Sequence, residues 1–147
     1  MARPRSPRPA RRWGTFPTTA DLGIWATGPT AASLLEGLGR ALYAVLADPR
    51  GVRPREERTV RAEGNDPAEL VVAFLGELLT LQETDGFLGR TVRAKTEGRP
   101  PKVVVARIAG EPFDPHRHVG RTEVKAVTYH ALRFDPVAGR ARVILDL

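Results

Sequence analysis

The amino-acid sequence predicts an α+β fold: a two-layer sandwich in which a mainly antiparallel sheet carries two helices on one face. The expected element order is β-α-β-α-β-β-β-β. Apolar residues recur at helical spacing in two segments only, residues 30–48 and 66–85. From residue 87 onward the pattern is that of strands, and the last of these follow one another across short connections. Strands joined in this way build antiparallel or mixed sheets, which commonly carry their helices on one side.

The first strand and helix are expected between residues 21 and 48. Residues 21–27 alternate apolar and other side chains and end at a Gly-Pro pair, which is typical of a short strand. A helix then begins near Thr30, whose hydroxyl can cap free backbone N–H groups. A stripe of leucine and valine repeats at helical spacing until Asp48, which precedes a proline. Residues 58–63 form the next expected strand, with Val60 facing inward.

The second helix has the clearest local signal in the chain. Asp66 supplies an N-cap acid, Pro67 takes the first helical position, and Glu69 stands where a capping box needs an acid. An apolar face follows, and the helix should end shortly before Gly86. The remaining strands are expected at residues 90–96, 102–108, 124–134 and 140–145, with a loop at 110–122 and a hairpin connection at 135–139.

The positive charge of the chain is concentrated at its N-terminus. The net charge is +6, and residues 1–12 contribute +5 of it through five arginines and no acid. Prolines oppose helix formation in that segment, so we expect residues 1–12 to be a disordered tail and residues 13–147 to be one nearly neutral domain. The tail lacks the apolar stretch of a secretory signal, and no apolar run approaches the roughly 20 residues that span a membrane. We therefore expect a cytoplasmic protein with no membrane partner.

Several chemistries are excluded by missing residues or motifs. The chain has no cysteine, which removes disulfides, thiol nucleophiles and cysteine-based zinc sites. No phosphate-binding glycine loop, serine elbow or zinc-protease helix motif occurs. Asp114, His116 and His118 offer donors to a transition metal, but a polar surface loop is favoured because no further ligands are evident. His130 lies in a predicted strand, where a packed and hydrogen-bonded structural role is favoured.

Three features point toward a site built from oxygen ligands. Asp21 stands at the start of the first strand, where its ordinary role is to shape the preceding turn. The last strand pattern ends in Asp146 and Leu147, so a carboxylate side chain and the α-carboxylate are adjacent. If these groups converge with Asp21, they would repel one another unless a hard divalent cation such as Ca²⁺, Mg²⁺ or Mn²⁺ lies between them. Lys125 lies in a predicted strand of a protein that otherwise prefers arginine, and an exposed position explains it equally well.

Five segments of the chain resemble motifs of the archease family. They follow in the family's order from about residue 15 to the last residue. In this sequence they read TADLGI from Thr19, LLTL followed by ETDGFL from Leu78, GEPFDP from Gly110 continuing to His118, EVKAVTYH from Glu123, and VILDL from Val143. One position departs from the pattern, because Thr18 replaces the histidine that opens the first motif.

The resemblance implies a small α+β protein that is no enzyme in its own right. It implies an activator of RtcB-type RNA ligase, the enzyme of tRNA splicing and RNA repair, which works through a guanylylated histidine. The activator promotes that guanylylation and multiple turnover, and RNA is reached only through the ligase. Asp21, Asp146 and the carboxylate of Leu147 correspond to the family's divalent-cation site, for which we expect Ca²⁺ ahead of Mg²⁺ or Mn²⁺. Lys125 matches a position connected with activation.

Two other classes of function remain as alternatives. A metal-dependent phosphohydrolase would use the same carboxylates, but it also needs a base or nucleophile that the sequence does not show. An RNA-binding module would carry aromatic and basic side chains interleaved on its strands. The aromatic content of 6% and the nearly neutral body disfavour that module.

Overall fold

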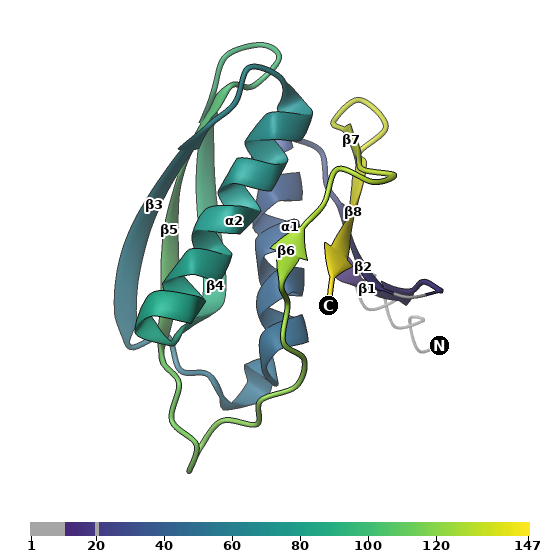
Figure 1. Ribbon diagram of the computed structural model, residues 1–147. Coiled ribbons are helices and arrows are strands. Elements are labelled where there is room, and N and C mark those ends of the chain that lie inside the picture. The colour runs from purple at the N-terminus through teal and green to yellow at the C-terminus, as the bar shows by residue number, and fades with distance from the viewer. Residues whose placement is uncertain (1–10, 20) are drawn as a thin grey trace, which may run out of the picture.

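Two helices lie between two antiparallel sheets in the computed structural model of the protein (Figure 1). The structure describes residues 11–19 and 21–147. The disorder predicted for the N-terminal tail therefore falls mostly outside the described residues. The α+β class and the antiparallel pairing predicted from the sequence are confirmed.

The larger sheet brings together both ends of the described chain. Its central strand, β8 (Arg140–Asp146), pairs with β2 (Leu22–Thr27) on one side. On the other side β8 pairs with two short strands, β6 (Ala126–Val127) and β7 (Arg133–Asp135). β1 (Trp13–Pro17) forms the outer edge beside β2. The second sheet has the order β3-β5-β4, formed by β3 (Glu56–Glu63), β5 (Val103–Pro112) and β4 (Phe87–Glu97).

Both helices begin at the caps that the sequence indicates. Helix α1 (Ala31–Leu46) starts at Thr30, whose hydroxyl accepts a hydrogen bond from the backbone N–H of Ser33 at 3.0 Å. A single 3₁₀ turn, η1 (Pro49–Gly51), follows α1. Helix α2 (Pro67–Asp85) starts at Asp66 and ends at Gly86, which takes the left-handed conformation at φ 66° that glycine adopts without strain.

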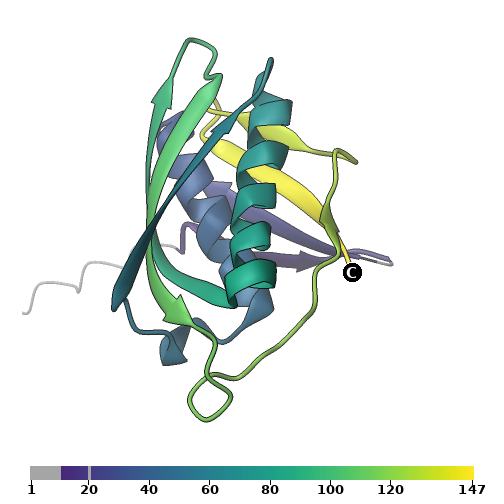
Figure 2. The same cartoon turned by 60° about the vertical axis from the view of Figure 1, so that its left-hand side comes forward.

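The arrangement of layers differs from the prediction. Helix α1 packs against β2 of the large sheet on one side and against β4 of the small sheet on the other (Figures 1 and 2). The expected two-layer sandwich with both helices on one face is therefore wrong in its layering, because the strands separate into two sheets with the helices between them. The burial of α1 supplies the physical reason, since nearly every residue of its last three turns is buried and such a helix must be covered on more than one side.

Two segments were predicted incorrectly. Strand β1 was not expected, and the strand predicted at residues 124–134 is broken into β6 and β7 by a turn in which Leu132 N–H donates to the carbonyl of Tyr129. His130 lies in that turn and is exposed, so the structural core role expected for it is also wrong. No helix in the described part of the chain is long and apolar enough to cross a lipid bilayer.

Candidate functional site

The ends of three neighbouring strands hold the residues singled out for a cation site. Leu22 of β2 pairs with Leu145 of β8, so the next step of the same register sets Asp21 beside Asp146. On the other side of β8, Ala126 of β6 pairs with Asp146, and the backbone N–H of Lys125 donates to the carbonyl of Asp146 at 2.8 Å. Segments that are distant in the sequence therefore meet at one end of the large sheet.

The turn before β2 orients Asp21 through a threonine. The backbone N–H of Asp21 donates to the hydroxyl of Thr18 at 3.0 Å, so Thr18 and not the aspartate carboxylate closes this turn. In the described part of the chain, no hydrogen bond ends on the carboxylate of Asp21 or of Asp146. Asp146 is exposed, whereas Asp21 and Leu147 are half-buried. The two side-chain carboxylates are thus available to a ligand.

The chemistry of this strand end suits a hard cation. Two aspartates and the carboxylate of Leu147 are all oxygen donors, which Ca²⁺, Mg²⁺ and Mn²⁺ prefer. Within residues 11–19 and 21–147 no group of three or more histidine, aspartate or glutamate side chains is placed to hold a metal ion. A cation held here would therefore need the terminal carboxylate in addition to Asp21 and Asp146.

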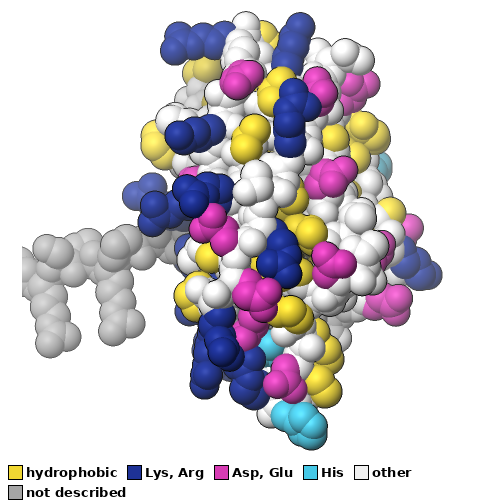
Figure 3. All heavy atoms as spheres, turned by 90° about the vertical axis from the view of Figure 1, so that its left-hand side faces the viewer, with side chains coloured by type: hydrophobic (Ala, Val, Ile, Leu, Met, Phe, Trp, Pro, Cys, Tyr) yellow, Lys and Arg dark blue, Asp and Glu magenta, His cyan; other side chains and the backbone are white. Residues whose placement is uncertain are grey.

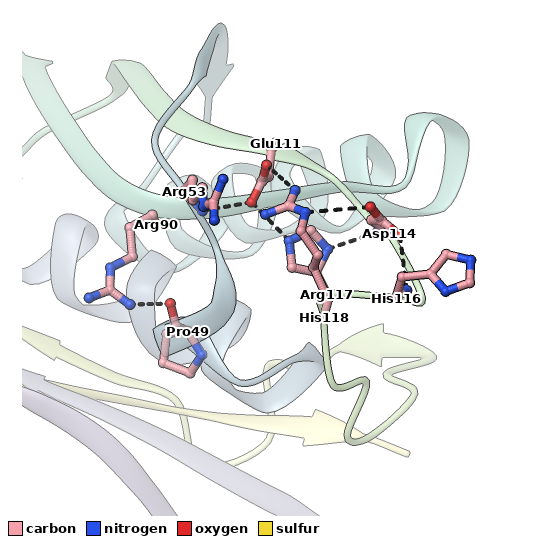
Figure 4. A network of polar contacts seen from close by, with 8 residues as sticks. All are labelled: Pro49, Arg53, Arg90, Glu111, Asp114, His116, Arg117 and His118. Carbon is pink, nitrogen blue, oxygen red and sulfur yellow. Dashed lines mark hydrogen bonds and ion pairs between the residues drawn. The ribbon is translucent and has the colours of Figure 1, made fainter.

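A second polar cluster lies at the far end of β5, where the loop after it folds back (Figure 4). The Glu111 side chain is 4% exposed and binds three partners. One of its carboxylate oxygens accepts from the Arg117 guanidinium at 2.5 Å. The other accepts from the backbone N–H of Arg53 at 2.7 Å and meets Nε2 of His118 at 2.9 Å. A buried carboxylate is tolerated here because each oxygen has a donor.

The electrostatics of this cluster favour its ionised acid. The hydrogen bond from Arg117, with smaller contributions from the Arg53 N–H and His118, lowers the pKa of Glu111 from 4.5 to about 2 against the opposing effect of burial. The pKa of Asp114 is also lowered, chiefly by the hydrogen bond from the backbone N–H of His116. Both carboxylates thus help to hold the loop closed.

The two histidines of this loop differ: the exposed His116 fits the polar surface loop expected from the sequence, whereas the buried His118 does not. His118 is buried, and its Nδ1 accepts from the backbone N–H of Asp114 at 2.7 Å while its Nε2 contacts Glu111. Both ring nitrogens are thereby occupied, which leaves none to bind a transition metal. The His116 ring is exposed and points away from that cluster (Figure 4). Sequence reasoning missed Glu111 because one of the donors to its buried carboxylate is the backbone N–H of Arg53, which is distant along the chain.

The fold and the strand end together define a class of protein: a small α+β domain with carboxylates located where β2 begins and β8 ends. The model of the Archease protein family (MTH1598/TM1083) matches residues 13–147. This chain belongs to the archease family.

Relatives and solved structures agree with this assignment. The chain is 33% identical over 126 residues to a protein archease of Pyrococcus furiosus, covering 85% of this chain and 89% of the relative. It is 36% identical over 138 residues to a protein archease of Methanopyrus kandleri, covering 92% and 99%. The solution structure of protein 1598 of Methanobacterium thermoautotrophicum matches with a TM-score of 0.74 at 30% identity, over 93% of this chain and 99% of that one.

A second solved structure shows the same fold at lower identity. It is the crystal structure of an archease from Thermotoga maritima, described as a possible chaperone. The match has a TM-score of 0.57 at 20% identity and covers 100% of both chains. At that identity the likeness concerns the fold alone.

Proposed function

We propose that this protein is a non-catalytic activator of an RtcB-type RNA ligase and that it promotes guanylylation of the ligase. Membership of the archease family supports the general class of the proposal. The observation that carries it furthest is the register of β2, β8 and β6, which gathers Asp21, Asp146 and Lys125 at one end of the large sheet.

The residues at this strand end would hold a divalent cation, with Ca²⁺ preferred over Mg²⁺ or Mn²⁺. Asp21, Asp146 and the carboxylate of Leu147 would be its ligands. When bound, the cation would supply positive charge next to the triphosphate during guanylyl transfer. Thr18 holds the backbone of Asp21, and the β6–β8 pairing holds the backbone of Lys125 beside Asp146. Lys125 adds an ammonium group that would contact a phosphate or an acidic group of the ligase.

A guanylylation assay with the cognate ligase tests the proposal. The assay compares the unaltered protein with Asp21→Ala, Asp146→Ala and a chain extended by several residues after Leu147. We expect each change to lower the stimulated rate at least about tenfold, because removing one preorganised electrostatic group in a catalytic site costs factors of about 10² to 10³. Lys125→Ala should lower it by a smaller factor.

A matched control is Glu77→Ala, since Glu77 is an exposed acid on α2, away from the strand end. This variant should stimulate the ligase as well as the unaltered chain. Circular dichroism would establish that all variants are folded. Full stimulation by Asp21→Ala, Asp146→Ala and the extended chain would contradict the proposal.

A further inference from the structure

The large sheet has an outer face that is turned away from the helices (Figure 1). This face carries a groove rich in arginine. We call it the arginine groove, and its polar and aromatic lining residues are Trp25, Thr27, Arg133, Asp135, Arg140 and Arg142. They come from β2, β8 and β7, the same sheet whose opposite end bears Asp21 and Asp146. The groove and the acidic strand end thus belong to one continuous sheet.

Three side chains stand in one row across the groove. Arg133 of β7 lies directly opposite Arg142 of β8, which lies directly opposite Trp25 of β2. Like charges directly opposite each other destabilise a sheet. Within the described residues, none of the three groove arginines forms an ion pair with an acid. An anionic ligand would relieve this repulsion.

One acid and one backbone carbonyl also lie at the groove. Asp135 lies opposite Arg140, and its carboxylate accepts from the backbone N–H of Ala138 at 3.0 Å. Nε of Arg142 donates to the carbonyl of Ala131 at 3.3 Å, which holds that guanidinium over the turn. Because three arginines face a single acid, the groove keeps an excess of positive charge.

An aromatic ring lies flat beside these arginines. Trp25 is paired with Gly14 of β1, and a Cβ added to Gly14 would lie 3.0 Å from the indole ring. The indole consequently covers the backbone of Gly14, which is buried although it lies on the outer face. Phe16 covers Gly23 in the same way on the neighbouring pair. One face of each ring is used against a glycine, and Trp25 stays half-buried beside the groove.

We propose that the arginine groove binds single-stranded RNA directly. Guanidinium groups that track phosphates and aromatic rings on which bases stack are the two elements of single-strand recognition on a sheet. Trp25 beside Arg142 and Arg133 supplies both, whereas an acidic peptide would need only the arginines. This differs from the expectation that RNA is reached through the ligase alone. The inference stands independently of the proposed activation, because its test uses no ligase.

The test measures binding of a labelled single-stranded RNA of about twelve nucleotides to the full-length chain by fluorescence anisotropy. The double variant Arg133→Gln/Arg140→Gln is compared with the matched control Arg93→Gln/Lys95→Gln, which removes the same charge from exposed positions on β4. We expect about a tenfold loss of affinity for the groove variant and less than about twofold for the control. The slope of log Kd against log salt should fall by about 0.7 for each lost phosphate contact.

A second measurement tests base stacking on Trp25 independently of the charge of the groove. In a Trp13→Phe background Trp25 is the one remaining tryptophan, and RNA should quench its fluorescence while polyglutamate should not. If Trp13→Phe fails to fold, the indole N–H signal of Trp25 in NMR of the unaltered chain gives the same readout.

Three outcomes would overturn the inference. Equal losses in the groove variant and the control would place RNA binding elsewhere, for example on the arginines of residues 1–12. An unquenched Trp25 at saturating RNA would remove the stacking contact. Polyglutamate that competes with RNA at equal affinity would identify an acidic peptide as the partner.

Discussion

The two sheets of this protein distribute the charged side chains on their outer faces differently. On the small sheet, Arg107 of β5 pairs with Glu57 of β3 at 2.8 Å, and Arg61 pairs with Glu63 at 2.7 Å. Figure 3 shows basic and acidic side chains intermingled on this side of the molecule. On the large sheet, the arginine groove lies at one end and Asp21 and Asp146 lie at the other.

The difference separates charges that are paired within the fold from charges that are left unpaired in the described residues. Exposed ion pairs such as Arg107–Glu57 neutralise each other and contribute little to stability. The groove arginines and the strand-end aspartates have no such partners within the described residues. The charge of each set is therefore not neutralised by a neighbouring side chain. Segregated charge of this kind attracts ligands of the opposite sign. We therefore propose that ligands bind the large sheet and that the charged pairs of the small sheet have a structural role.

The largest expected effect concerns glycines in the two sheets. A Cβ on Gly110 of β5 would overlap the carbonyl oxygen of Leu88, a backbone atom of the neighbouring strand. We expect Gly110→Ala to lower the free energy of unfolding by about 3 kcal/mol, because a backbone cannot move aside easily. On the large sheet the three atoms nearest to a Cβ on Gly23 all belong to the ring of Phe16, which can rotate, so Gly23→Ala should cost about 1 kcal/mol.

Urea unfolding of both variants measures this contrast. Equal losses for the two would mean that Phe16 is held as rigidly as a backbone. That result would contradict the expectation that the Phe16 ring can move aside.

Buried and exposed acids should also respond differently. Glu111→Gln should lower the free energy of unfolding by about 2 kcal/mol at neutral pH. The substitution removes the negative charge that accepts a hydrogen bond from the Arg117 guanidinium and contacts the His118 ring. Since the pKa of Glu111 falls from 4.5 to about 2 on folding, its stabilisation is present above about pH 4.5 and is lost as the pH falls toward 2. The variant should therefore lose less stability than the unaltered chain between pH 5 and pH 2.

Urea unfolding across that pH range checks the prediction, with Asp146→Asn as the control on the large sheet. Asp146→Asn should leave neutral-pH stability almost unchanged. A larger loss of unfolding free energy for Asp146→Asn than for Glu111→Gln would contradict the account, because Asp146 would then support the fold more than Glu111 does.

The smallest effect concerns single surface charges. Arg133→Gln removes one of two like charges, because Arg133 lies opposite Arg142. It should raise the free energy of unfolding by roughly 0.3 kcal/mol. Glu57→Gln breaks an exposed ion pair and should lower it by a similar amount. Thermal unfolding at low and high salt measures both, and the two differences should shrink in salt. A destabilised Arg133→Gln variant would show that the groove arginines support the fold.

The elements with strong local signals were predictable from the sequence. Thr30 and Asp66 mark the helix starts that the structure shows, and Gly86 marks the end of α2. The separation into two sheets was not predictable, because it depends on the pairing of β3 with β5. These strands are separated in the sequence by α2 and β4. β1 was missed because its glycine and proline are unfavourable in strands, and the cross-strand cover of Gly14 by Trp25 is invisible along the chain.

Of the candidate binding regions, one was also predictable from the sequence and the other was not. Asp21, Asp146 and Lys125 were recognisable because of their places in predicted strands and because each lies in a motif that resembles the family. The register then sets them at one sheet end. The groove was not recognisable, because Trp25 and Arg133 are far apart in sequence and become neighbours only through β8. Overall composition cannot reveal such a groove, since a low aromatic content says nothing about where one tryptophan lies.

The most direct test of the division between the sheets is an NMR titration of the isotopically labelled full-length chain. Ca²⁺ and a short single-stranded RNA are added separately, and backbone amide shifts are followed. We predict that Ca²⁺ shifts the signals around Asp21 and Asp146, that RNA shifts those around Trp25, Arg133 and Arg142, and that the outer face of β3, β5 and β4 stays unchanged. Shifts centred on that small-sheet face, or no saturable shift at either end of the large sheet, would contradict the division.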